Sequence, residues 1–213
     1  MATERPILFT PDNVRAILAG TKTQTRRVVK PQPQPDTWND EPCISWQQRK
    51  RSKWFAWDRG SGMQFDPSIA NVCPYGAPGD VLWVREAWAL VPATAYRASD
   101  VVQTVSPDDA HDAAIYKAGW PLSPPSVSWR PSIFMPRWAA RLTLRITEVR
   151  VERVQDISEA DAWAEGVKPA VSIIIPHDAG RRAYAALWDS INGKKYPWAS
   201  NPWVWAITFE VLK

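Results

Sequence analysis

Four residues near the N-terminus have types and a spacing that could support chemistry: Lys22, Thr25, Arg26 and Arg27. Neighbouring positive charge disfavours an ammonium ion, so the two arginines are expected to lower the pKa of Lys22. A neutral lysine can act as a general base and activate a hydroxyl such as that of Thr25. The same composition is also typical of a solvated basic loop, which the spacing alone favours.

Two later segments carry further candidates. Glu165 is expected at the C-terminal end of a helix, where the helix dipole is unfavourable for a carboxylate. Such a position is sometimes functional, although a surface Glu is the commoner case. The segment Met135-Pro136-Arg137-Trp138 places a cation beside an indole, a pair that more often packs as a cation–π contact than binds a ligand.

Several common kinds of site have no motif in the sequence. There is no Ser/His/Asp motif, no Gly-rich phosphate loop and no metal signature. Cys43, Cys73, His111 and His177 are the only cysteines and histidines, and none has metal-ligand spacing. We therefore expect no metal and no other cofactor.

The sequence also bears on the compartment. Isolated cysteines without a signal peptide fit a reducing cytoplasm. No apolar stretch approaches the ~20 residues that span a bilayer, so no membrane partner is expected.

Tryptophan and positive charge are both unusual in this chain. Fourteen of the 213 residues are Trp, more than a core of this size requires, so some of the indoles are expected at a surface. The formal net charge is +4, and the excess is confined to residues 1–59. A basic face attracts a polyanion such as nucleic acid, although a solvated surface that maintains solubility explains the same charge. Stacking of a base on an indole is worth about 1–3 kcal/mol, and the candidates are Trp54, Trp57, Trp88 and Trp138.

The elements that would position these residues are mostly strands. Residues 11–19 predict a helix with Thr10 as its N-cap and Gly20 after its end, which delivers the chain into the Lys22 segment. A second helix begins after Ser158 and ends at Gly166, so that Glu165 lies in its last turn. The other predicted elements are strands over 6–9, 81–88, 114–117, 141–154 and 203–211 and a helix over 178–190.

This order contains no repeated strand–helix–strand series, so a doubly wound sheet is not expected. We predict an α+β fold, a small mixed β-barrel with flanking helices, in a single domain over residues 1–213. Two segments, at about 31–72 and 91–128, are interpreted as Pro- and Trp-rich insertions. Alternating prolines force an extended path at the start of the first insertion, and its Trp54-Phe55-Ala56-Trp57 run predicts a strand.

Two motifs in this order resemble a known family. Leu18-Ala19-Gly20-Thr21-Lys22-Thr23-Gln24-Thr25-Arg26-Arg27, followed by Pro78-Gly79-Asp80-Val81-Leu82-Trp83-Val84, resembles the signatures of the ASCH domain family, a branch of the PUA-like barrel superfamily. Residues 129–139 and 201–205 more closely resemble the larger ASCH-like proteins of bacteriophages and prophages, which would place the protein in a host cytoplasm. The resemblance covers most of the chain apart from the two insertions.

The resemblance implies a PUA-like barrel with a groove for a nucleic acid strand or a nucleobase. By its motif the chain is similar to the bacterial N4-acetylcytidine amidohydrolases, which remove the acetyl group from that modified nucleoside. In this comparison Thr25 would be the nucleophile, Lys22 its activating base and Glu165 the proton donor, while Arg27 could hold an oxyanion or a phosphate.

The chain also departs from the small enzymes. It is much longer, and it carries Arg26 where they tend to have an apolar residue, so the partner is either a modified nucleoside or a larger single-stranded nucleic acid. A non-catalytic module that binds RNA, DNA or a modified base is the alternative, as is a nuclease of the ASCH type. The candidates for contacts to substrate or nucleic acid are Arg26, Arg27, Arg85, Trp88, Arg137, Trp138, Trp54 and Trp57.

Overall fold

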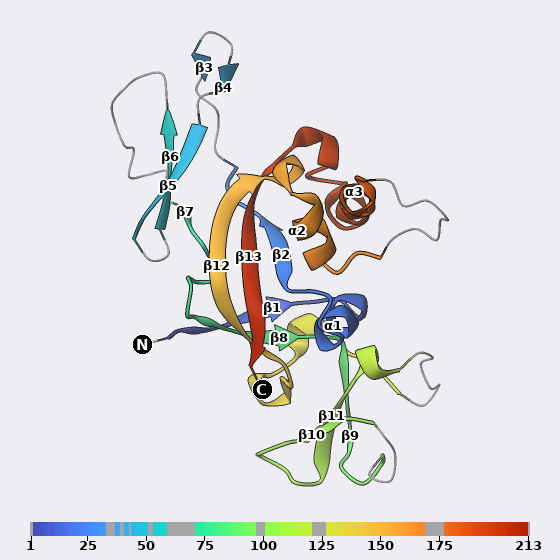
Figure 1. Cartoon of the computed structure of the whole chain (residues 1–213). Coiled ribbons are helices and arrows are strands. Elements are labelled where there is room, and N and C mark those ends of the chain that lie inside the picture. The colour runs from blue at the N-terminus through green and yellow to red at the C-terminus, as the bar shows by residue number, and fades with distance from the viewer. Residues whose placement is uncertain are drawn as a thin grey trace. The chain divides into compact units, whose positions relative to one another are not determined.

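The computed structural model describes residues 2–32, 37–38, 41–42, 44–50, 53–58, 71–96, 101–120, 127–168 and 177–212. Many strands and few helices make up this part of the chain, as the sequence predicts for an α+β protein (Figure 1). The chain divides into two compact units, which are described one at a time. The first unit comprises Met1–Thr21, Asp80–Arg145 and Glu210–Lys213, and the second comprises Lys22–Gly79 and Ile146–Phe209.

The first unit begins with the predicted strand and helix. Strand β1 (Glu4–Leu8) runs parallel to β8 (Val81–Arg85), and the first residues of β12 (Thr143–Arg153) pair with β8 in the antiparallel sense. Helix α1 (Pro11–Leu18) starts where the sequence predicts, because the Thr10 hydroxyl accepts a hydrogen bond from the Asn13 amide and caps it. Gly20 follows the helix with a φ of +72°, a conformation that favours glycine.

A second sheet of the first unit lies within and beside the predicted insertion at 91–128. Strands β9 (Trp88–Pro92), β10 (Gln103–Val105) and β11 (Asp112–Tyr116) pair in the order β10-β11-β9. Short 3-10 helices follow at η2 (Lys117–Gly119), η3 (Ser132–Phe134) and η4 (Arg137–Ala139).

The strand predicted over residues 81–88 is wrong in one respect, because β8 and β9 are separate strands. The chain leaves the ladder at Glu86, whose amide bonds to the sulfur of Met135 and whose carboxylate is buried against Arg141. The amide of Trp88 then bonds to the carbonyl of Arg130 and starts a new pairing.

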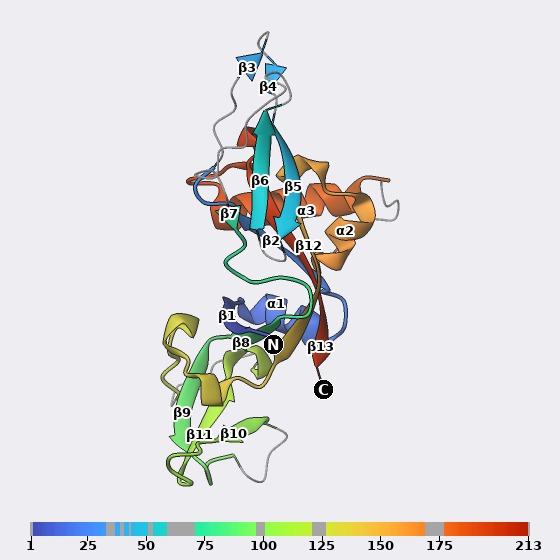
Figure 2. The same ribbon diagram turned by 90° about the vertical axis from the view of Figure 1, so that its left-hand side faces the viewer.

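The second unit contains the Lys22 segment. Strand β2 (Gln24–Val28) pairs in the antiparallel sense with β13 (Trp203–Leu212), and β12 leads through η5 (Val154–Asp156) into helix α2 (Glu159–Ala164). Helices α2 and α3 (Ala179–Asn192) lie side by side in both views (Figures 1 and 2), and η6 (Trp198–Ser200) precedes β13. The core of this unit combines residues from both helices with residues from the strands and their connections: Val154, Ile157, Ala162, Tyr184, Trp188 and Val204.

Five strands form one sheet in the order β1-β8-β12-β13-β2, and β12 and β13 have residues in both units. Strands β1 and β2 are the edges of this sheet, so no pairing among the described residues closes it into a barrel. The α+β class is therefore confirmed, while the barrel is not among the described pairings.

The insertion predicted at 31–72 contributes short paired strands to the second unit. Strands β3 (Thr37–Trp38) and β4 (Glu41–Pro42) pair, and β5 (Ile44–Lys50), β6 (Lys53–Asp58) and β7 (Asn71–Val72) form a three-stranded sheet. The predicted strand at Trp54–Trp57 is confirmed within β6. The side chains of Trp54 and Trp57 lie outside the described part of the structure, so their predicted role in binding stays a prediction.

Two features are absent from the described ranges. No group of three His, Cys, Asp or Glu side chains in those ranges is arranged to hold a metal ion. No helix within them is both long enough and apolar enough to cross a membrane.

Candidate active site

Lys22 and Glu165 meet in the second unit although 143 positions separate them. The Lys22 ammonium donates to Glu165 Oε2 at 2.7 Å and to the Glu165 backbone carbonyl at 2.8 Å. The backbone aligns the pair, because the two residues form an isolated antiparallel bridge and the Thr23 amide donates to the carbonyl of Ala164. Both side chains are buried. The structure thus brings together two of the three residues predicted to be catalytic.

The local sequence explains why helix α2 ends at Glu165. The Ser158 hydroxyl accepts from the Asp161 amide and starts α2, and Gly166, with a φ of +79°, follows its end. Glu165 is the residue that caps the C-terminus. Its carboxylate therefore lies at the unfavourable end of the helix dipole and is stabilised instead by cations.

Arg26 is the second cation on this carboxylate. Its Nη1 donates to Glu165 Oε1 at 3.2 Å, its Nε to Glu152 Oε1 at 2.7 Å and its Nη2 to Asp161 Oδ2 at 3.3 Å. The two oxygens of Glu165 thus have one cation each, Lys22 on Oε2 and Arg26 on Oε1. The prediction that Arg26 contacts a substrate is not supported by this placement, because three protein carboxylates already surround its buried guanidinium.

Further polar residues complete what we call the Lys22–Glu165 cluster: Lys22, Arg26, Arg150, Glu152, Asp161 and Glu165. Arg150 pairs with Asp161 at 3.0 Å and with Glu152 at 3.5 Å. Three cations therefore balance three carboxylates, which limits the cost of burying charge. Gln24 donates to Asp161 at 2.8 Å, and the Tyr184 ring lies 5.9 Å from the Arg26 guanidinium.

Glu152, Asp161 and Tyr184 belong to the site but are not among the residues that the sequence motifs indicate. One signal could have found Asp161, because it precedes Glu165 by four positions on the same helix and so faces the same side. Glu152 and Tyr184 reach Arg26 only through the packing of β12 and α3, which no local pattern reveals.

Burial shifts the protonation of the cluster. Desolvation lowers the pKa of Lys22 below its ordinary value, the charge of Glu165 opposes this shift, and Arg27 and Arg26 reinforce it. Burial, together with the nearby charge of Glu165, raises the pKa of Tyr184 well above its ordinary value. Lys22 therefore gives up its proton more readily than an exposed lysine, which is what a general base requires.

Thr25 and Arg27 occupy the alternate positions of β2. In the pairing with β13, Arg26 lies opposite Ala206 and Thr25 opposite Ile207, and successive side chains of a strand point to opposite faces. Thr25 is buried, and its hydroxyl makes no hydrogen bond to Lys22, to Glu165 or to any other residue in the described ranges. The predicted nucleophile is thus adjacent in sequence to the cluster but not bonded to it.

The remaining binding candidates belong to the first unit. Trp88 is only 3% exposed and packs in a core cluster with Tyr116, Met135 and Ala139, with the ring of Trp138 edge-on at 6.2 Å. This placement does not support the prediction that Trp88 stacks on a base, because Arg130 lies over its ring at 5.2 Å and core residues surround it.

Arg85 and Arg137 are placed differently, and both lie close to the ring of Trp83. Their guanidinium groups lie 5.4 Å and 5.8 Å from the ring of Trp83. Arg85 also donates to the carbonyls of Met135 and Ile133, and Arg137 pairs with Glu4 at 2.5 Å. These two arginines and Trp83 form a surface that we call the Trp83 surface.

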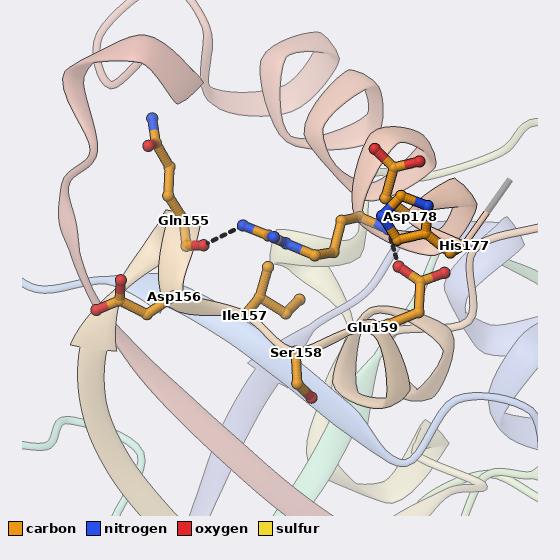
Figure 3. Close-up of a pocket in the computed structure, with 8 residues that line it drawn as sticks. Gln155, Asp156, Ile157, Ser158, Glu159, His177 and Asp178 are labelled. Atoms are coloured by element: carbon orange, nitrogen blue, oxygen red, sulfur yellow. Dashed lines mark hydrogen bonds between the residues drawn. The ribbon is translucent and has the colours of Figure 1, made fainter.

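One cavity among the described residues lies beside the start of α2 and α3 (Figure 3), with a volume of about 540 Å³. The Glu159 carboxylate accepts from the amides of Gly180 and Arg181 at 2.6 Å and 3.0 Å, and the Arg181 guanidinium donates to the Gln155 carbonyl at 2.8 Å. Glu159, a polar residue that lines the cavity, thus caps the start of α3 and connects α3 to α2. None of the predicted catalytic residues lines it; the lining residues are Gln155, Asp156, Ile157, Ser158, Glu159, His177, Asp178 and Arg181.

Comparison of the chain with protein families, with curated proteins and with solved structures finds no match.

Proposed function

We propose that this protein is an amidohydrolase that removes an acyl group from N4-acylated cytosine, as a nucleoside or within a strand. The observation that carries the proposal is the 2.7 Å contact between the Lys22 ammonium and the Glu165 carboxylate. Two residues that the ASCH motifs single out, far apart in sequence, form one buried pair. The PUA-like barrel belongs to the same proposal, supported by the mixed sheet that holds β2 and by the helix that follows β12.

The chemistry requires a base, a nucleophile and a proton for the leaving nitrogen. In the proposed reaction a hydroxyl oxygen attacks the acyl carbon while its proton passes to the neutral amine of Lys22. The bond from the acyl carbon to N4 breaks, and N4 receives that proton through Glu165, which lies within hydrogen-bond distance of Lys22. Water then releases the acyl group as a carboxylic acid and restores the hydroxyl.

Two variants test the pair directly. Lys22→Met and Glu165→Gln are compared with the wild type in deacetylation of N4-acetylcytidine followed by chromatography, with circular dichroism as the measure of folding. Loss of a positioned acid or base lowers the rate by about 10²–10⁴-fold. Lys194→Met changes an exposed lysine and is the matched control. Equal rates in all four proteins, or no turnover by any of them over several acyl groups, would contradict the proposal.

Thr25 is the proposed nucleophile and needs its own test, because its hydroxyl is not bonded to Lys22. Thr25→Ser retains a hydroxyl, whereas Thr25→Val removes it and preserves the shape of the side chain. We expect the Ser variant to keep part of the deacetylase activity and the Val variant to lose it. If Thr25→Val is as active as the wild type, Thr25 is not the nucleophile.

The Trp83 surface supports a second candidate function, the binding of single-stranded nucleic acid. Two guanidinium groups lie close to one indole, at 5.4 Å and 5.8 Å from its centroid. Phe134, next to the carbonyl that Arg85 contacts, is 69% exposed. Cations that follow a phosphate backbone beside an aromatic platform are typical of single-strand binding.

Fluorescence anisotropy with labelled RNA and DNA strands tests this candidate. Phe134→Ala is expected to weaken binding by about tenfold, since stacking on an aromatic ring contributes about 1–3 kcal/mol, and the affinity should fall as salt rises. Val105→Ala, an exposed apolar change elsewhere in the same unit, is the control. Absence of binding at low salt would exclude the candidate. Cleavage of the same strands with and without a chelator tests the nuclease alternative.

A further inference from the structure

A second, smaller cavity lies wholly within the first unit. Its volume is about 200 Å³, which is below the ~300–1,000 Å³ of sites for drug-sized ligands. It therefore has room for a single ring system. The lining combines apolar, aromatic and cationic residues from β11, η2 and the segments that flank β10 and β12: Val101, Val102, Tyr116, Gly119, Trp120 and Arg141.

The aromatic part of the lining is held in place by protein contacts. The Tyr116 hydroxyl bonds to the carbonyl of Ala139 at 2.8 Å and to the hydroxyl of Thr104, which fixes the orientation of its buried ring. The Trp120 ring has Tyr96 edge-on at 5.2 Å and Trp129 at 6.4 Å. Rigid aromatic side chains give a ligand contact area at low entropic cost.

Arg141 supplies a fixed cation to the same cavity. Its Nε and Nη2 donate to the two oxygens of buried Glu86 at 2.8 Å and 3.0 Å, and its guanidinium lies over the Tyr116 ring at 4.1 Å. A guanidinium has five N–H groups, and no residue in the described ranges accepts from Arg141 Nη1. Because Glu86 neutralises the charge of Arg141, the site favours a neutral acceptor over an anion.

A second donor of the lining residues also lacks an acceptor. The indole nitrogen of Trp120 is buried and has no hydrogen-bond partner in the described part of the chain. A buried polar group without a partner costs free energy, and a ligand with an acceptor oxygen would recover it.

We propose that this cavity binds an uncharged, planar heterocycle of single-ring size that carries a carbonyl oxygen, with a pyrimidine nucleobase as the fitting chemistry. The ring packs against the aromatic lining, and the carbonyl oxygen accepts from Arg141 Nη1 or the Trp120 indole. The base can come from a free nucleoside or from a nucleic acid strand. The site shares no residue with the Lys22–Glu165 cluster, so it stands or falls independently of the proposed deacetylation.

Gly119 allows the cavity to be filled without disturbing its charges. Gly119 lines the cavity, and a Cβ added there meets no heavy atom within 4 Å, so Gly119→Leu should fold and narrow the cavity or its mouth. Binding of uridine is measured by saturation-transfer NMR and calorimetry for the wild type, Gly119→Leu and the control Val105→Leu, whose site is exposed and does not line the cavity. We expect saturable binding that Gly119→Leu weakens by at least about tenfold and that Val105→Leu leaves unchanged.

Further measurements identify which residues contact the ligand and whether a nucleic acid strand can supply the base. Trp120→Phe retains a ring and removes the indole N–H, and should weaken uridine binding by up to about tenfold, as loss of one hydrogen bond does. Adenosine, with its two-ring base, should bind more weakly than uridine, and a short oligouridine that competes with uridine would show that a strand can deliver the base. No saturable uridine binding, or equal binding by the wild type and a folded Gly119→Leu, would overturn the proposal, whatever the result of the deacetylase assay.

Discussion

Arg26 in the second unit and Arg137 in the first both pair with carboxylates, yet only one of them keeps contact with solvent. The side chain of Arg26 is 0% exposed and contacts three acidic residues, whereas that of Arg137 is 46% exposed and pairs with Glu4. A buried guanidinium is committed to its partners, because its removal leaves carboxylates unpaired away from water. An exposed one can exchange its carboxylate for a phosphate at little cost.

The two arginines differ because of their burial and not because they belong to different units. Arg141 also belongs to the first unit, but its partner Glu86 is buried and binds it through both oxygens. Burial raises the pKa of Glu86, and Arg141 opposes that shift. The first unit thus contains both kinds of arginine, one that organises a cavity and one that can meet a ligand at the surface.

The largest effect is expected from Arg26→Met. The substitution keeps an unbranched apolar side chain but leaves Glu152, Asp161 and Glu165 without their shared cation. Breaking a buried ion pair costs about 3–5 kcal/mol, so urea denaturation should show a loss of that size. Arg145→Met, in a pair exposed on both sides, is the control and should cost less than about 1 kcal/mol. Similar losses in the two variants would contradict the distinction between buried and exposed arginines.

Glu86→Gln should have the next largest effect. The amide retains one acceptor for Arg141 but loses the charge, and a hydrogen bond to a charged group contributes about 1.5–3 kcal/mol. The face of Tyr116 still stabilises the cation, so we expect a loss of about 2 kcal/mol in the free energy of unfolding. Glu210→Gln, the same change at the exposed partner of Arg145, is the matched control. A loss at Glu86 no larger than that at Glu210 would show that burial does not set the strength of these pairs.

The sequence predicts the elements of both units better than it predicts these pairs. Caps at Thr10 and Ser158 mark the starts of α1 and α2 because capping is a local interaction, and alternation marks β12 for the same reason. The meeting of Lys22 with Glu165 is anticipated only through the family resemblance. The sequence does not reveal that Arg26 is fully paired with protein carboxylates, because those acidic residues come from β12 and α2, more than a hundred positions away.

The interruption between β8 and β9 at Glu86 is another feature that local sequence does not predict. Val81 to Trp88 has the composition of one continuous strand, and only the distant partners Met135 and Arg141 explain why the ladder stops. The abundance of tryptophan alone makes Trp88 a candidate for stacking on a base at a surface. Its burial depends on the packing of η4 and β11, which the pattern of the strand alone does not reveal.

Burial of Lys22 is expected to make the free energy of unfolding depend on pH. Its pKa is lowered from the ordinary value of 10.5, first by burial, so between the lowered pKa and 10.5 the folded chain holds fewer protons than the unfolded chain. The free energy of unfolding therefore gains a contribution that rises with pH in that window and is constant below it. Urea denaturation of the wild type and Lys22→Met at several pH values should show a difference that grows by at most about 1.4 kcal/mol per pH unit. A difference that is flat or falls would contradict the lowered pKa.

Glu4→Gln should have the smallest effect on stability and an opposite effect on binding. Its pair with Arg137 is exposed, so its loss should cost less than about 1 kcal/mol in urea denaturation. Arg137 is then released from a carboxylate that competes with phosphate, and the affinity for a labelled single strand at low salt should increase. The double variant Glu4→Gln, Arg137→Gln is the control and should lose that gain. If Glu4→Gln instead destabilises the protein as much as Glu86→Gln, or leaves strand binding unchanged, Arg137 is a structural cation like Arg26 and the Trp83 surface is not a binding site.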